Sequence, residues 1–293
     1  MNRLIDETFL QRLANLRFIV KGRRKGRLSG LHASPRAGVS LEFADYREYV
    51  AGDDFRYIDW NVYGRLDRVL VKTYVHEADL PIYLLVDFSA SMQLGEDRSK
   101  TRYAARLAIA LAYLGLRGLD RVGLFPFTNR LIPAVSVRHG MGQLGRILRL
   151  LSDTQPGGLT SLNEALSEFV ARTKESGLVI LLTDFLSPDG YEEGISRLLH
   201  RGDEVIAIQI LDPEEIGPTA AGPSQLLDVE TNRDLKLTIG PQTLEAYVER
   251  FAEHRRRLRT FLTERGIPYV LASTDMPVER LIHERLRAGG VLR

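Results

Sequence analysis

Oxygen-bearing side chains recur at short spacing after an apolar stretch in the first third of the chain. Asp87, Ser89 and Ser91 follow directly on the apolar residues 82–86. Side chains at alternate positions of a loop can converge on one point, and a carboxylate with two hydroxyls is a hard oxygen donor set. Such a set favours Mg²⁺, accepts Mn²⁺ and disfavours zinc. The spacing therefore predicts a divalent-cation site.

A second acid, Asp184, follows another apolar stretch at residues 178–182. If both stretches are neighbouring parallel strands, their carboxyl ends meet at the edge where open α/β sheets bind ligands. Two close buried carboxylates either share a proton or hold a cation. Thr160, in a loop opened by two glycines, would add a further hydroxyl, and the adjacent Ser161 is the alternative ligand.

The elements that would position these residues alternate between apolar strands and amphipathic helices from residue 81 onward. This alternation predicts a parallel sheet with helices on both faces. Only three residues separate the strand that ends at Phe127 from the strand that begins at Leu131. Such a connection is too short for a crossover helix, so these two strands should form an antiparallel hairpin at one edge of the sheet. The expected strands are 82–86, 121–127, 131–135, 178–182, 204–211 and 268–272, and the expected helices 101–118, 140–153, 161–174, 189–201, 242–266 and 276–287.

Residues 38–79 have a different pattern, with short strand-like pieces separated by turn signals. We therefore predict two domains: residues 1–80 with an N-terminal helix and a small β-rich unit, and residues 81–293 with the α/β domain and C-terminal helices. Trp60, the single tryptophan, is expected in the core between the two units. Residues 213–223, with three prolines and two glycines, should form a surface loop.

Composition excludes several classes of protein. The 293 residues are 44% hydrophobic and 27% charged, and they include no cysteine, which excludes thiol catalysis and thiolate metal sites. No apolar run approaches the roughly 20 residues of a membrane span. The first thirty residues are typical of an amphipathic helix and not of a signal sequence, so we expect a cytoplasmic protein. The formal charge of +2 and a basic run at residues 21–27 without aromatic residues argue against a nucleic-acid partner.

The order of these residues resembles the metal-ion-dependent adhesion site of von Willebrand factor type A domains, which is Asp-x-Ser-x-Ser, then Thr, then Asp. The five positions are filled here by Asp87, Ser89, Ser91, Thr160 and Asp184. The resemblance implies a doubly wound, mostly parallel sheet with one short antiparallel edge strand, and a bound Mg²⁺ that captures a Glu or Asp of a protein partner. One departure from the pattern is that Leu159 separates Thr160 from the glycines.

The upstream segment looks like the domain of unknown function 58 family, which places such a block before a type A domain. The matching residues are Glu42-Phe43, Arg47-x-Tyr49, Gly52-Asp53-Asp54-x-Arg56-x-Ile58-Asp59-Trp60, Arg65 and Val71-Lys72. The family is bacterial or archaeal and accompanies MoxR-type AAA+ ATPases, so the resemblance implies a partner of that class. Asp53, Asp54 and Asp59 could hold a second cation, but nearby arginines favour a structural turn with ion pairs.

Two functions remain open at this stage. A hard cation with an open position can bind an acidic side chain, or it can activate water in a metal-assisted hydrolase or phosphotransferase. The second needs a base beside the metal, yet the six histidines all lie outside the motif segments, and no phosphate-binding loop of the Gly-Lys-Ser/Thr type is present. We therefore predict a non-enzymatic adaptor.

Overall fold

The computed structural model describes residues 12–13, 16, 18–19, 25–28, 42–50, 55, 58–77, 80–93, 99–218, 222–227 and 234–292. The chain forms two compact units, one from Met1–Val20 together with Leu80–Arg293 and the other from Lys21–Asp79. In the larger unit, Leu13, Leu16 and Phe18 belong to the hydrophobic core. The division into residues 1–80 and 81–293 stays a prediction.

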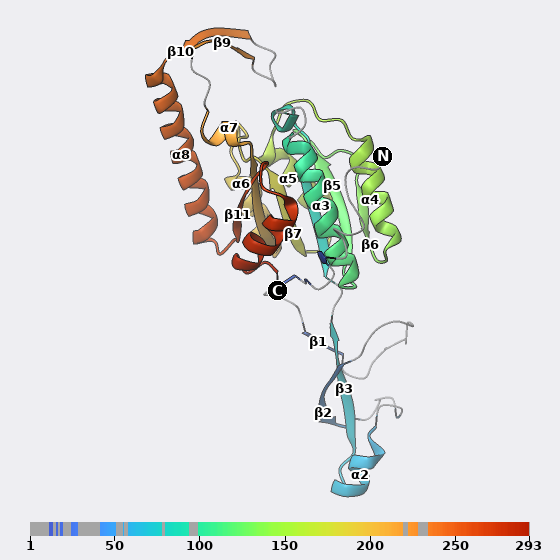
Figure 1. Cartoon of the computed structure of the whole chain (residues 1–293). Helices are drawn as coiled ribbons and strands as arrows, with labels where there is room; N and C mark the ends of the chain where they lie inside the picture. The colour runs from blue at the N-terminus through green and yellow to red at the C-terminus, as the bar shows by residue number, and fades with distance from the viewer. Residues whose placement is uncertain are drawn as a thin grey trace. The chain divides into compact units, whose positions relative to one another are not determined.

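A six-stranded sheet organises the larger unit, in the order β11-β8-β7-β4-β5-β6 (Figure 1). Every neighbouring pair is parallel except β5 and β6, which are antiparallel. The predicted doubly wound, mostly parallel sheet with one antiparallel edge strand is therefore confirmed. The strands are β4 (Pro81–Asp87), β5 (Arg121–Phe127), β6 (Val135–Arg138), β7 (Leu178–Thr183), β8 (Glu204–Leu211) and β11 (Tyr269–Ser273).

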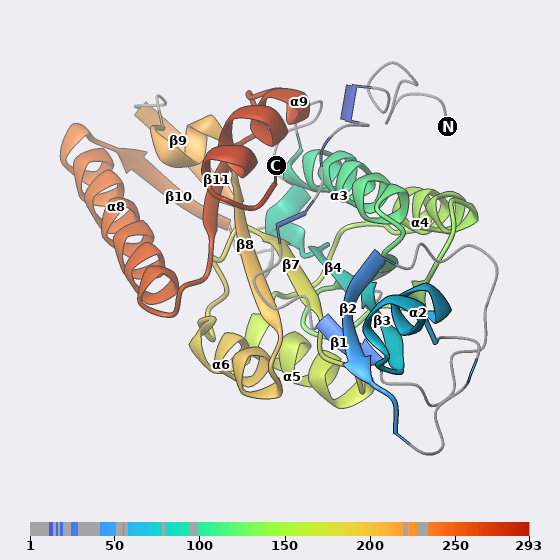
Figure 2. The same cartoon turned by 90° about the horizontal axis from the view of Figure 1, so that it is seen from below.

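Helices cover both faces of this sheet, with α3 and α4 on one side and α5 and α6 on the other (Figure 2). The side chains of β4 alternate between two cores: Ile82 and Leu84 pack with the first pair of helices, and Tyr83 and Leu85 with the second. Because both faces are covered, β4 and β7 are buried along their whole length, and their residues are apolar as far as Val86 and Leu182. The main helices are α3 (Lys100–Arg117), α4 (Gly142–Asp153), α5 (Leu162–Arg172), α6 (Glu192–Arg201) and α8 (Pro241–Glu264).

The C-terminal part of the larger unit ends in the short helix α9 (Val278–Arg280) and a π-helical turn at Leu281–Leu286. The buried Leu281 and Ile282 belong to the same core as α3 and α4. The predicted helix at 276–287 is thus present, although part of it has the wider π geometry.

The edge hairpin lies later in the sequence than predicted. Phe127 and Leu131 form an isolated antiparallel bridge, but the strand that follows is β6 and not residues 131–135. The Leu131 amide donates to Glu168 Oε2 at 2.8 Å, and Pro133 has no amide hydrogen to donate to the sheet, so the regular strand begins only at Val135.

The predicted surface loop at 213–223 was wrong in part. It contains α7 (Pro213–Ile216), and it leads into an antiparallel pair of strands, β9 (Gly222–Leu227) and β10 (Asp234–Ile239). Pro213 begins α7 because proline is well suited to the first helical position, and Asp212 caps the helix.

The smaller unit is an antiparallel sheet in the order β1-β3-β2, with one helix described. Its elements are β1 (Lys25–Leu28), β2 (Glu42–Glu48), α2 (Trp60–Leu66) and β3 (Leu70–Glu77). A register shift between Phe43 and Asp45 makes β2 a single bulged strand.

Asp59 has a structural role in this unit. Its carboxylate accepts hydrogen bonds from the Asn61 and Val62 amides and caps α2, while Tyr46 donates to its other oxygen at 2.8 Å. Trp60 is the first residue of α2 and is 62% exposed, so it is not part of the core of the smaller unit, and its expected position between the two units stays a prediction. Asp53 and Asp54, and most of the basic run at 21–27, lie outside the described residues.

Within the described part of the chain, no helix combines the length and the apolar composition needed to cross a bilayer.

Candidate metal centre

Asp87 lies at the carboxyl end of β4 and is fully buried. Its Oδ1 accepts a hydrogen bond from the Ser89 amide at 2.8 Å, and its Oδ2 accepts one from Thr183 Oγ1 at 2.6 Å. The first bond closes a turn of the kind that aspartate favours, which directs the chain sharply out of the strand. The second joins the ends of two neighbouring strands, β4 and β7.

Asp184 follows β7 and is also fully buried. Its Oδ1 accepts from the Leu186 amide at 3.0 Å. The intervening Phe185 has a φ of 58°, a left-handed conformation that is uncommon for a bulky side chain and is found at functional sites more often than elsewhere. This reversal brings the amide of Leu186 back to the Asp184 carboxylate.

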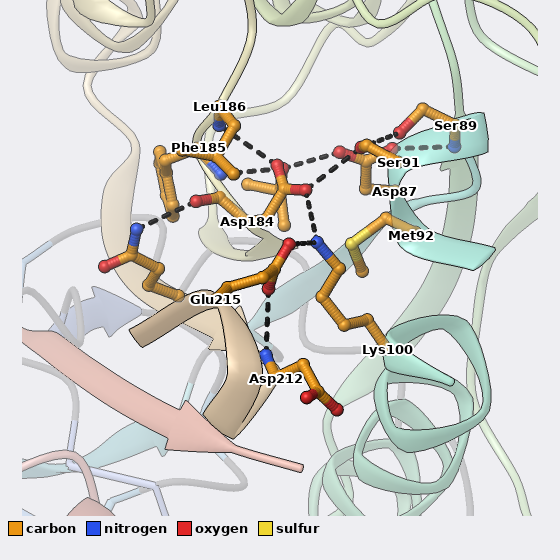
Figure 3. A network of polar contacts seen from close by, with 12 residues as sticks. Asp87, Ser89, Ser91, Met92, Lys100, Asp184, Phe185, Leu186, Asp212 and Glu215 are labelled. Atoms are coloured by element: carbon orange, nitrogen blue, oxygen red, sulfur yellow. Dashed lines mark hydrogen bonds and ion pairs between the residues drawn. The ribbon is translucent and has the colours of Figure 1, made fainter. Parts of the chain in front are cut away.

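A chain of hydrogen bonds links the two acids through the two serines (Figure 3). Ser89 Oγ and Ser91 Oγ are 3.0 Å apart, and Ser91 Oγ donates to Asp184 Oδ2 at 3.0 Å. Four of the five predicted ligands therefore meet at one edge of the sheet.

The loop that carries Thr160 is attached to the Asp87 loop through the backbone. The Gly157 amide donates to Phe88 O at 2.8 Å, and the Ala90 amide donates to Gly158 O at 3.1 Å. Gly158 has a φ of 82°, which explains why a glycine stands there. Thr160 is 6% exposed in this loop, so it is buried beside the motif.

Ser161, the alternative ligand, is engaged elsewhere. Its Oγ donates to Asp189 Oδ2 at 2.8 Å, and the same carboxylate oxygen accepts the Asn163 amide at 3.1 Å. Asp189, which lies in a neighbouring loop, thus accepts a hydrogen bond from a backbone amide in the first turn of α5. This arrangement favours Thr160 over Ser161, and metal ligation by either residue stays a prediction.

A lysine that the sequence analysis missed completes the cluster. Lys100 Nζ lies 2.9 Å from Asp184 Oδ2 and 2.6 Å from Glu215 Oε1, and the lysine side chain is fully buried (Figure 3). Lys100 is the first residue of α3. A cation there opposes the positive end of the helix dipole, and this unfavourable placement is the signal that could have identified it.

The electrostatics of the site follow from burial and from like charges. Burial, assisted by the neighbouring Asp184 carboxylate, raises the pKa of Asp87 to about 7, against hydrogen bonds from Thr183 and Ser89. Burial alone would lower the pKa of Lys100, but the carboxylates of Asp184 and Glu215 outweigh it and raise that pKa. Burial also raises the pKa of Glu215 despite the adjacent ammonium. Lys100 is therefore charged at neutral pH.

Further residues brace Asp184 and Glu215. Gln209 Nε2 donates to the Asp184 carbonyl at 2.8 Å, and Tyr269 donates to Gln209 Oε1 at 2.6 Å. Glu215 Oε2 accepts the Asp212 amide at 2.9 Å as part of the capping box of α7. The carboxylates thus have fixed positions before any ligand binds.

The residues present fit a hard divalent cation. Two carboxylates are buried here, and the raised pKa of Asp87 indicates that a nearby positive charge would stabilise its ionised form. The hydroxyls of Ser89, Ser91 and Thr160 are further oxygen donors for such a cation. Among the described residues, no group of three or more His, Cys, Asp or Glu side chains forms an alternative metal site.

A surface hollow of about 640 Å³ lies beside the loop after β7. Leu186 and residues of α8, among them Tyr247, Phe251 and His254, line it. Tyr247 donates to the Glu215 carbonyl at 3.1 Å, and the His254 ring is 2.9 Å from the Phe185 carbonyl. Although none of the five predicted ligands lines the hollow, these contacts connect its wall to the candidate site.

Comparison with known proteins gives the family. The family model "Protein of unknown function DUF58" matches residues 45–257. The chain belongs to this family. An uncharacterized protein of Mycobacterium tuberculosis is 27% identical over 274 residues, which is 92% of this chain and 86% of that protein. An uncharacterized protein of Mycobacterium avium is 26% identical over 144 residues, 49% of this chain and 85% of that protein.

Solved structures are similar at lower identity. The conserved hypothetical protein BatB from Bacteroides thetaiotaomicron is 15% identical with a TM-score of 0.43, covering 72% of this chain and 98% of that chain. Proximal thread matrix protein 1 from the mussel byssus, described with a zinc-occupied MIDAS motif, is 16% identical with a TM-score of 0.40, covering 70% of this chain and 46% of that chain.

Proposed function

We propose that this DUF58 protein is a non-enzymatic, metal-dependent adaptor that binds an acidic residue of a partner protein. The observation that carries the proposal is the hydrogen-bonded chain from Asp87 through Ser89 and Ser91 to Asp184. In the proposal, these four residues and Thr160 hold Mg²⁺, or Mn²⁺ in its place. The bound cation would supply an open coordination position and positive charge for an incoming carboxylate.

The chain's own residues are arranged for binding. Backbone and side-chain hydrogen bonds fix Asp87 and Asp184 before a ligand arrives, and this lowers the cost of ordering them. Three of the five ligands are neutral hydroxyls, so a bound cation would keep more of its charge for the partner than an all-carboxylate site would allow. A Glu or Asp from the partner is therefore the expected ligand.

The same geometry disfavours an enzyme, because none of the described side chains in contact with the two acids serves as a free base. Lys100 is charged and engaged by two carboxylates. His254 contacts the Phe185 carbonyl and not the acids. A metal-assisted hydrolase or phosphotransferase would need such a base next to the reacting water.

The partner class and the location extend the proposal. The family resemblance implies a MoxR-type AAA+ ATPase, with a role in the assembly or maturation of a complex. The proposal also places this protein in the cytoplasm, as its sequence predicts.

The test measures binding of the purified protein to a MoxR-type ATPase from the same genome by biolayer interferometry. Binding is measured once in excess chelator, without added metal, and once in about 1 mM Mg²⁺. We expect binding in Mg²⁺ only, and its loss in Ser89→Ala and Thr160→Ala. Ser152→Ala is the control, because this hydroxyl donates only to the Leu148 carbonyl on the outside of α4. Binding that persists in chelator and in Ser89→Ala would contradict the metal-dependent mechanism.

A phosphoester hydrolysis assay on the same samples addresses catalysis. We expect background rates from the wild type. Turnover that disappears in Ser89→Ala but not in Ser152→Ala would make the protein a metal-assisted hydrolase.

A further inference from the structure

Lys100 places a permanent positive charge against the oxygen of Asp184 that faces the candidate site. The ammonium contacts Asp184 Oδ2, and Ser91 Oγ donates to the same oxygen. Lys100 is fully buried, so water does not screen this charge. Any divalent cation held by Ser91 and Asp184 would therefore lie in the field of the lysine.

The charges around the cluster explain why a lysine stands there. Asp87, Asp184 and Glu215 bring three carboxyl groups into one buried region, and Lys100 is the only cation that the described hydrogen bonds and ion pairs place among them. Without a positive charge, Asp184 and Glu215 would repel each other. A buried ion pair that loses one partner is strongly destabilising.

Lys100 also connects three elements. It begins α3, Asp184 follows β7, and Glu215 belongs to α7. Glu215 has its second oxygen bound to the Asp212 amide, so it cannot turn away without opening the capping box of α7. The ammonium is thus held in place from both sides.

We propose that Lys100 is the built-in counter-cation of the metal centre: it keeps the acidic cluster assembled between metal-binding events and lowers the affinity of the cluster for divalent cations. This inference rests on the proposed function, because it concerns the same site. Glu215 has the opposite effect, since it offsets the charge of Lys100. The two residues together would set the metal affinity without being ligands.

The experiment measures the Mn²⁺ dissociation constant by isothermal titration calorimetry, and melting temperatures with and without Mg²⁺. Lys100→Met removes the charge at nearly constant volume, and we expect about tenfold tighter Mn²⁺ binding. Its metal-free melting temperature should fall, and Mg²⁺ should raise it by more than in the wild type. Glu215→Gln keeps the hydrogen-bonding shape, and we expect about tenfold weaker Mn²⁺ binding because the charge of Lys100 is then less offset.

Lys174→Met is the matched control, because this exposed lysine precedes β7 and lies at the other end of the strand from Asp184. Its Mn²⁺ affinity should equal that of the wild type. If Lys100→Met does not fold, as judged by circular dichroism, the weaker binding by Glu215→Gln remains a complete test, since a purely structural ion pair would leave the affinity unchanged.

The outcomes separate this inference from the proposed function. Equal Mn²⁺ affinity in the wild type, Lys100→Met and Glu215→Gln would overturn the role of Lys100 and leave the metal centre in place. No binding in any of the three would overturn both. If Mn²⁺ binds to Lys100→Met but not to the wild type or Glu215→Gln, the result would support Lys100 as the counter-cation. It would also contradict the proposal that the natural protein binds a metal ion.

Discussion

Asp87 is the residue whose replacement should separate metal binding from folding. Asp87→Asn keeps the size of the side chain and retains an acceptor for the Ser89 amide, while Thr183 can rotate its hydroxyl to accept from the new amide. Because burial and Asp184 disfavour the charged form of Asp87, we expect the metal-free variant to be more stable than the wild type by about 1 kcal/mol at pH 8. Chemical denaturation measures this difference.

The same variant should lose the stabilisation that Mg²⁺ gives the wild type. Asp153→Asn is the control, since this exposed acid ends α4 on the surface, and its response to Mg²⁺ should be unchanged. If the metal-free Asp87→Asn protein is less stable than the wild type, the hydrogen bonds of the Asp87 carboxylate stabilise the fold by more than its buried charge destabilises it.

The site residues differed in how far the sequence could predict them. Asp87, Ser89, Ser91 and Asp184 were identifiable because their order along the chain matches a known pattern and because strand ends fix their positions. Lys100 and Glu215 were not, because their pairing joins residues 115 positions apart and depends on where α7 forms. Thr183 lies just beyond the expected strand 178–182 and was not among the predicted site residues, although its hydroxyl donates to Asp87.

At the scale of elements, α5 depends on a cap from outside its own sequence. Asp189 accepts hydrogen bonds from Ser161 and the Asn163 amide, so Asp189→Ala should lower the free energy of unfolding by about 1 kcal/mol. The shift in melting temperature on adding Mg²⁺ should stay the same, as it should in Ser161→Ala. Loss of the Mg²⁺ response in Ser161→Ala, with Thr160→Ala unaffected, would reverse the assignment of the ligand.

The close approach of β4 and β7 depends on Gly177, just before β7. A Cβ on this residue would lie 2.1 Å from the Pro81 carbonyl oxygen, and a backbone atom cannot move away as a flexible side chain can. Gly177→Ala should therefore lower the free energy of unfolding by about 3 kcal/mol in a denaturant titration.

Gly145→Ala is the control for this effect. Gly145 lies inside α4, where an added Cβ would meet nothing within 4 Å, so alanine should stabilise the protein by about 0.5 to 1 kcal/mol. Equal stability of the two variants would mean that the β4–β7 junction can relax around a methyl group.

The sequence predicted most elements of the larger unit because their apolar periodicity is strong and most of the sheet strands are followed by a helix. Its omissions have local causes. The helix α2 was not predicted, because the aspartate that caps it was interpreted as part of a turn. The prolines near α7 and β9 indicated a loop, but one of them begins the helix and another lies in an edge strand, where both are tolerated. The later start of β6 follows from Pro133, which the sequence shows inside the expected strand 131–135, and from a hydrogen bond to Glu168 in another element, which the sequence does not show.

For the whole molecule, removal of the metal should affect recognition and not the fold. The candidate ligands lie at the carboxyl end of β4 and in the segments that follow the strands, whereas the buried apolar residues of the strands form the core. At millimolar Mg²⁺ and a sub-millimolar dissociation constant, the proposed metal binding would add about 1 to 2 kcal/mol to stability. Chelator should therefore lower the melting temperature by about 2 to 8 °C, leave the far-UV circular dichroism unchanged and abolish partner binding. Unfolding by chelator alone would show a structural metal instead.

The strand order has a further consequence for how motion is distributed around the site. β4 and β7 are adjacent at the centre of the sheet, so their amides should exchange hydrogen for deuterium only when the whole unit unfolds. Asp87 and Asp184 are attached to these slowest-exchanging strands, while Glu215 belongs to a four-residue helix that follows β8 and leads away from the sheet. A partner would therefore meet a site of which the side attached to β4 and β7 is immobile, while the side formed by α7 can open independently. Deuterium uptake in α7 would then rise before any uptake in β4 or β7.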